Sequence, residues 1–226
     1  MDEGSSLPLL VWLSPAFPVG SFAYSHGLEW AHEAGDVVGF ETCREWSAAL
    51  VSSGSGRNDA IILSETWRAM CDTDFQRLDT LIELSLALQP SSERYLESTM
   101  QGKAFLSTAR AAWSNEALDK FSKHHKGDIT YPVAIGIVSA TYKMALPQVL
   151  EAFLMAFVSN LVSACVRLGA IGQTDGQRVI ASLMPLIREE AHNAQSSTLD
   201  DLGSCVFRSD LASLHHETQY TRLFRS

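Results

Sequence analysis

Val149–Val166 reads VLEAFLMAFVSNLVSACV and is the most apolar stretch of the chain. A helix that spans a membrane needs about 20 consecutive, predominantly apolar residues. This stretch is shorter, and Glu151, Asn160 and small polar residues interrupt it. We therefore expect a buried helix here rather than a membrane span.

Helical periodicity extends outward from this stretch in both directions. In residues 74–88, for example, Phe75, Leu78, Ile82 and Leu86 recur at helical spacing. Val, Ile and Thr nowhere cluster into alternating, strand-like runs. We expect helices over residues 22–34, 41–52, 59–70, 74–88, 93–113, 131–144, 147–168, 175–195 and 210–216. The sequence thus predicts an all-α fold, a single compact domain of roughly ten helices over residues 1–226.

Capping and breaking residues set the expected boundaries. Ser21 can cap the helix of residues 22–34, and Pro185 should kink the helix of residues 175–195. Residues 119–128 are rich in polar side chains and are expected to form a connection. Residues 1–6 are expected to be a flexible N-terminus.

Composition narrows the range of partners and compartments. The 226 residues carry a net charge of −9, and the 17 basic residues are scattered along the chain. Nucleic acids and anionic membranes bind clustered Lys and Arg, so neither partner is expected. The first residues lack a basic region followed by an apolar run, which argues against a signal peptide and for a cytoplasmic protein.

The four cysteines do not form a metal or redox motif. They lie at positions 43, 71, 165 and 205, and no two of them make a CxxC pair. A zinc site and a disulfide framework are therefore not expected, and the sequence indicates no cofactor. We expect the cysteines to be small buried hydrophobic residues.

Two near-matches to catalytic motifs lack an essential part. Ser25 and His26 resemble a hydrolase nucleophile elbow, but they are sequence neighbours on an expected helix, so their side chains diverge. His216–Tyr220 reads HETQY, which has Tyr220 where the zinc motif HExxH has its second histidine. No P-loop motif is present. The sequence therefore does not predict an enzyme.

The C-terminal segment reads HHETQYTRLFRS over residues 215–226. It carries Tyr220, Phe224, Arg222 and Arg225, and Tyr and Arg are enriched at binding hot spots. Residues 217–226 are therefore expected to be a tail that docks onto a partner.

Three segments together resemble one family, the urease accessory protein UreF family. Leu13–Trp30 (LSPAFPVGSFAYSHGLEW) resembles its opening motif, and Arg167–Gln173 (RLGAIGQ) resembles a second motif. Residues 201–204 and 216–226 resemble its C-terminal signature. Weaker matches lie between these segments, including Glu93-Arg94, so the resemblance spans nearly the whole chain.

The resemblance implies an all-α, cytoplasmic homodimer that is not an enzyme. Members of the family assemble with the UreD/UreH-type accessory protein and the GTPase UreG on apo-urease, and they support nickel insertion and maturation of the metallocentre. The resemblance also implies a tail that is loosely held in the isolated protein and ordered by the UreD/UreH-type partner.

Candidate site residues follow from the matched positions. Glu29 and Arg167 match positions implicated in control of the GTPase. The full set of expected partner-binding residues is Phe22, Tyr24, Glu29, Arg167, Gly172, Gln173, His216, Glu217, Tyr220, Arg222, Leu223, Phe224 and Arg225. Two alternatives stay open: His216 as a transient nickel ligand, and Arg167 as an arginine finger that completes the GTPase site.

Overall fold

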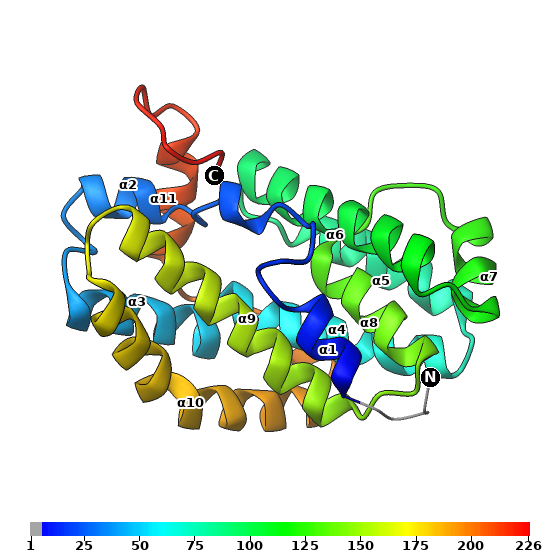
Figure 1. Cartoon of the computed structure of the whole chain (residues 1–226). Helices are drawn as coiled ribbons and strands as arrows, with labels where there is room; N and C mark the ends of the chain where they lie inside the picture. The colour runs from blue at the N-terminus through cyan, green and yellow to red at the C-terminus, as the bar shows by residue number, and fades with distance from the viewer. Residues whose placement is uncertain (1–5) are drawn as a thin grey trace.

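A computed structural model describes residues 6–226, and every regular element in that range is a helix (Figure 1). The expected all-α fold is therefore confirmed. The α-helices are α1 (Leu7–Trp12), α2 (Leu28–Glu33), α3 (Phe40–Ser53), α4 (Ser55–Cys71), α5 (Phe75–Ala87), α6 (Ser92–Ala112), α7 (Glu116–His124), α8 (Tyr131–Thr141), α9 (Leu146–Arg167), α10 (Gln173–Ser196) and α11 (Phe207–His216). Two 3-10 turns, η1 (Ser21–Ala23) and η2 (Leu199–Asp201), complete the described chain. The expected flexible N-terminus falls mainly on residues 1–5, outside the described residues.

Helix α4 is the centre of the bundle, because it packs against α3, α5, α8, α9 and α10. Helix α8 is buried over most of its length, which is why its sequence is apolar on all sides. Helices α9 and α10 pack side by side along one edge of the molecule (Figure 1). One continuous apolar core joins these helices into a single compact arrangement.

Helix α9 contains the apolar stretch of residues 149–166. By length and composition it is the one helix among residues 6–226 that could cross a membrane, which is weak evidence because core helices pass the same test. Half of its most apolar window is buried within the fold, against α3, α4 and α10. Its position therefore agrees with the expectation of a buried helix.

The expected helix over residues 22–34 is wrong in its first half. Two residues of positive φ interrupt it, namely His26 (61°) and Gly27 (77°). Only residues 21–23 form a 3-10 turn, and α2 begins at Leu28. Gly27 is needed for a second reason, because a Cβ atom there would lie 2.9 Å from the Ser213 amide nitrogen of α11.

The expected polar connection over residues 119–128 is also wrong, because α7 occupies most of it. Asn115 caps α7 by accepting a hydrogen bond from the Leu118 amide at 2.9 Å. Leu118 and Phe121 are buried on its inner face. Pro185 lies within α10, which continues through it and changes direction along its length in Figure 1.

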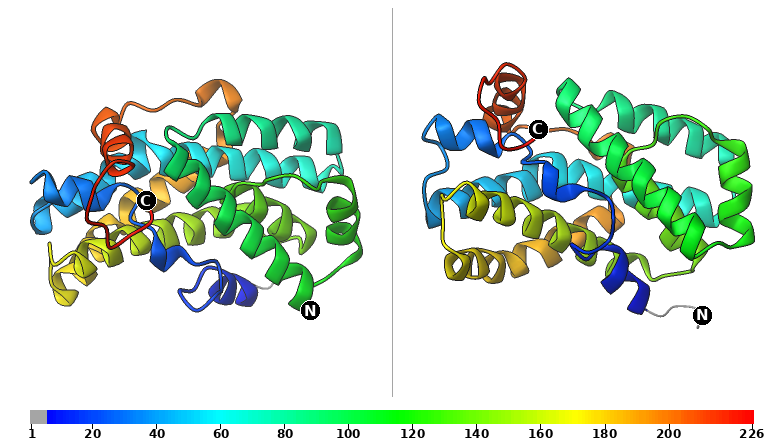
Figure 2. Two further views of the ribbon diagram at one scale, coloured as in Figure 1. Left: turned by 90° about the horizontal axis from the view of Figure 1, so that it is seen from above. Right: turned by 45° about the horizontal axis from the view of Figure 1, so that its top comes forward.

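The two ends of the described chain lie on different sides of the molecule (Figure 2). Helix α1 packs against α9, whereas α11 packs against α2 and α6. The residues after α11 fold back toward the segment between η1 and α2, close to the N-terminal end of α6 (Figure 2).

Candidate functional site

The C-terminal tail is fixed by backbone hydrogen bonds to the opening segment. The Arg225 amide donates to the Ala23 carbonyl at 2.8 Å, and the Ser25 amide donates to the Ser226 carbonyl at 2.7 Å. The Ser25 hydroxyl donates to the same Ser226 carbonyl. The expectation of a loosely held tail is therefore wrong, because the protein's own fold supplies the partners of the tail.

Glu29 binds the tail through its side chain. One carboxylate oxygen accepts a hydrogen bond from the Leu223 amide at 2.6 Å. The other oxygen accepts one from the Phe224 amide at 2.9 Å and lies 3.1 Å from Nε2 of His216. Hydrogen bonds to an ionised group are stronger than neutral ones, so Glu29 determines the position of this part of the tail.

His216 connects Glu29 to a second carboxylate. Its side chain is fully buried, and its Nδ1 lies 2.6 Å from Oε2 of Glu93 at the start of α6. The other oxygen of Glu93 accepts a hydrogen bond from Nη1 of Arg222 at 2.7 Å. Both ring nitrogens of His216 face carboxylate oxygens, and both can donate only when the ring is an imidazolium. The His216 ring therefore bridges the carboxylates of Glu29 on α2 and Glu93 on α6.

A second buried network lies beneath the last residue. The Ser226 hydroxyl donates to Oε2 of Glu97 at 2.6 Å, and Arg94 forms an ion pair with the same carboxylate. Burial would raise the pKa of Glu97, but the charge of Arg94 and the nearby His26, whose Nδ1 lies 3.7 Å from Oε1, outweigh it and hold the pKa below its usual range. The final residue of the chain is thereby tied to a charged pair in the interior.

Arg167 joins the opening segment, the C-terminal end of α9 and the tail. Its guanidinium carbon lies 3.8 Å from the ring centroid of Phe22 and 4.3 Å from that of Phe224. Its Nη1 also donates to the Phe22 carbonyl. The guanidinium therefore stacks between two aromatic rings, a contact for which a planar arginine is better suited than lysine.

Several side chains of the tail point outward. Tyr220 is completely exposed, and Leu223 is 66% exposed although its amide binds Glu29. Arg225 is also exposed, whereas Phe224 is buried. The tail thus has an inner side that binds its own fold and an outer side rich in hot-spot residue types.

Four other expected site residues lie in the core or at or beside the start of a helix. Glu217 accepts hydrogen bonds from the amide and hydroxyl of Ser92, at 2.9 and 2.7 Å, and so holds the start of α6. Tyr24 is buried in the core. Gly172 and Gln173 begin α10, and neither contributes a hydrogen bond or ion pair to the tail networks of the described chain. The networks that hold the tail therefore contain only part of the expected set, and the side chains of these four residues lie outside those networks.

The catalytic near-matches do not form catalytic pairs. The Ser25 hydroxyl binds Ser226, while Nε2 of His26 lies 2.7 Å from the hydroxyl of Ser55. His216 is buried but Tyr220 is fully exposed, so the HETQY segment does not converge on one site. Within residues 6–226, no group of three or more His, Cys, Asp or Glu side chains could hold a metal ion.

Sequence reasoning missed the roles of four residues that hold the tail: Ser25, Glu93, Arg94 and Glu97. Ser25 lies inside the opening motif, and Glu93-Arg94 was one of the weaker family matches. Glu93, Arg94 and Glu97 lie at i, i+1 and i+4 near the start of α6. This spacing was a usable signal, because charged side chains that become buried seldom lack partners.

Comparison with known proteins gives one consistent result. The family model described as UreF matches residues 37–184. A urease accessory protein UreF from Rhodopseudomonas palustris (strain BisA53) is 51% identical over 218 residues, covering 96% of this chain and 92% of the relative. One from Xanthobacter autotrophicus is 50% identical over 222 residues, covering 98% and 91%. One from Bradyrhizobium diazoefficiens is 50% identical over 218 residues, covering 96% and 90%.

Proposed function

The chain belongs to the urease accessory protein UreF family, and from this membership we propose that it is a non-catalytic scaffold and regulator of urease maturation. In this role it assembles with the UreD/UreH-type accessory protein and the GTPase UreG on apo-urease, where nickel enters the metallocentre. We further propose that it acts in the cytoplasm as a homodimer.

The observation that carries the proposal is the fixed, two-sided tail. Glu29, His216 and Glu93 hold its inner side, while Tyr220 and Leu223 project from the outer side. Binding through a pre-ordered segment costs less conformational entropy than binding through a disordered one. The tail is therefore suited to dock onto the UreD/UreH-type partner without first having to fold.

The proposed regulatory role rests on Glu29 and Arg167. Both residues bind the tail, so a partner that engages the tail also contacts the surface that they shape. The guanidinium of Arg167 stacks between Phe22 and Phe224, which leaves it poorly placed to reach a phosphoryl group as an arginine finger. We therefore favour a role in which Arg167 shapes the docking surface and does not take part in GTP hydrolysis.

The alternative of a transient nickel site at His216 gains no support from the geometry. Each ring nitrogen already faces a carboxylate oxygen, at 2.6 and 3.1 Å. A nickel ion would have to displace one of these carboxylates inside a fully buried site. Nickel titration of the isolated protein tests this alternative, and binding at micromolar nickel would revive it.

Reconstituted maturation tests the proposed function. Apo-urease is incubated with nickel, bicarbonate, GTP, UreG and the UreD/UreH-type protein, with and without this chain, and urease activity and bound nickel are measured. We expect both readouts to require the chain. Equal activation in its absence would contradict the proposed role. Met184→Ala serves as a surface control, because Met184 is an exposed residue of α10 and, within the described chain, contributes to none of the networks that hold the tail.

A further inference from the structure

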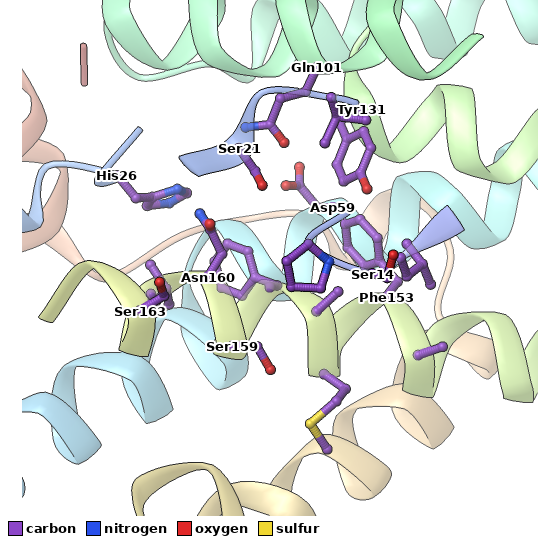
Figure 3. A pocket seen from close by; sticks show the side chains of 18 of the residues that line it. Ser14, Ser21, His26, Asp59, Gln101, Tyr131, Phe153, Ser159, Asn160 and Ser163 are labelled. Atoms are coloured by element: carbon purple, nitrogen blue, oxygen red, sulfur yellow. The ribbon is translucent and has the colours of Figure 1, made fainter. Parts of the chain in front are cut away.

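A cavity of about 490 Å³ lies between α1, α4, α6 and α9 (Figure 3). Its volume is within the range of about 300–1,000 Å³ that is typical of small-molecule sites. Most of its wall is apolar and includes Leu9 and Leu13 in and just after α1 and Phe153, Met155 and Phe157 of α9. An occupant would therefore bury an apolar or aromatic body.

The cavity also has a polar wall, which includes His26, Asp59, Arg94, Glu97 and Tyr131. Ser159, Asn160 and Ser163 of α9 line the cavity as well (Figure 3). Arg94 and Glu97 form an ion pair, and burial lowers the pKa of His26 to about 4, so the ring is neutral near pH 7. Burial also raises the pKa of Tyr131, so its phenol stays protonated. Among these five side chains of the polar wall, Asp59 therefore carries the one charge that is not paired with an opposite charge.

Asp59 is the acidic group of the cavity that lacks a counter-charge. Its carboxyl points into the cavity, toward the space that His26, Gln101 and Tyr131 also face (Figure 3). Within residues 6–226 no side chain or amide forms a hydrogen bond or ion pair with it, although Arg94 and Glu97 act on it electrostatically. An ionised carboxylate left unpaired beside an apolar wall is costly unless a cation joins it.

We propose that this cavity binds a small organic cation, a primary amine or amidine on an apolar or aromatic body, with Asp59 as its counter-ion. The apolar wall of α9 and α1 would take the body of the ligand, and the neutral remainder of the polar wall leaves the Asp59 charge uncompensated. The Tyr131 hydroxyl adds a polar group near the same space (Figure 3). This inference does not depend on the proposed role in urease maturation.

The probes that test it are benzylamine and benzyl alcohol, which match in shape and differ in charge. Binding to the full chain is measured by calorimetry at about pH 8, above the pKa of about 7 to which burial raises Asp59. We expect benzylamine to bind roughly tenfold more tightly than benzyl alcohol, and the preference to shrink at about pH 6.

Two variants test whether Asp59 causes the preference for the amine and whether both probes bind in this cavity. Asp59→Asn should remove the preference for the amine and leave the affinity for the alcohol unchanged. Ala156→Phe, which places a ring in the cavity wall, should reduce the binding of both probes. The proposal is overturned if neither probe binds, if both bind equally to the unmodified chain, if Asp59→Asn keeps the preference, or if Ala156→Phe affects neither probe.

Discussion

Asp59 and His26 line the same cavity, and their ionisation changes the stability of the fold in opposite directions. Burial raises the pKa of Asp59 to about 7, so the folded state keeps a proton that the unfolded chain loses near pH 4. Stability then falls as the pH rises from about 4 to 7. Burial lowers the pKa of His26 to about 4, so stability falls as the pH drops from about 6.5 to 4. In the unmodified protein the two effects partly cancel.

Asp59→Asn should separate these effects. The variant lacks the ionisation that destabilises the fold, so its free energy of unfolding should rise relative to the unmodified protein between about pH 4 and 7. The limiting slope is about 1.4 kcal/mol per pH unit. Urea unfolding at several pH values measures the difference, with Asp72→Asn on the surface as control. A difference that stays constant with pH would contradict the assignment.

Glu29→Gln tests how firmly the tail is held. The change removes the charge that accepts hydrogen bonds from the amides of Leu223 and Phe224. A hydrogen bond to a charged group contributes about 1.5–3 kcal/mol. We expect hydrogen exchange of these two amides to accelerate by roughly 10- to 100-fold, as follows from a loss of about 1.4–2.8 kcal/mol.

A matched control lies one turn further along α2. Glu33 accepts a hydrogen bond from Nε2 of Gln219 at 2.6 Å, but at the exposed surface. Glu33→Gln should leave the exchange of Leu223 and Phe224 nearly unchanged. Equal exchange rates in the two variants would show that Glu29 does not hold the tail.

At the scale of single residues, the sequence indicated Glu29, Arg167 and His216 as important but not what they contact. Their roles depend on residues more than 100 positions away, such as the pairing of His216 with Glu93 and of Arg167 with Phe22. Periodicity and composition report local structure and carry no information on such distant contacts. Asp59 went unnoticed for the same reason, since only the fold places it in a cavity.

At the scale of helices, periodicity predicted the long elements well. Helices α3, α5, α6, α8 and α9 begin and end within about three residues of the expected limits. The errors fall where backbone conformation or burial is decided by neighbours, at residues 22–27 and 119–124. Positive φ at His26 and Gly27 explains the first error, and the buried face of α7 explains the second.

Helix α6 packs closely against the segment before α8, and a single substitution can test this contact between elements. A Cβ atom at Gly102 would lie 2.2 Å from the Ile129 carbonyl oxygen and 2.7 Å from the carbonyl carbon of Thr130. Backbone atoms cannot rotate away, so Gly102→Ala should destabilise the fold by about 2 kcal/mol or more despite the better helix propensity of alanine.

Thermal unfolding measures this effect, with a fall in Tm of about 4 °C or more expected for a chain of this size. Gly203→Ala is the control, because no atom lies within 4 Å of a Cβ at that position. A Gly102→Ala variant as stable as the control would contradict the close approach of α6 to residues 129–130.

At the scale of the whole molecule, the tail completes the fold. Phe224 and Ser226 are buried, and the ion pairs beneath them join α2, α6 and α11. Deletion of residues 222–226 would therefore leave Glu29 without its two amide donors and expose the site of Phe224. Loss of partner binding after such a deletion would have two possible causes, so it is a weaker test than a change confined to the outer side.

The most direct test of the account changes only that outer side. The affinity of the UreD/UreH-type protein is measured for the unmodified chain and for a Tyr220→Ala, Leu223→Ala double variant, whose exposed side chains make no contribution to the inner network. Two hot spots of about 2 kcal/mol each predict a loss of affinity of about 10³-fold, with unchanged thermal stability. An affinity that stays within about threefold of the original would contradict the central claim that this tail is the docking surface.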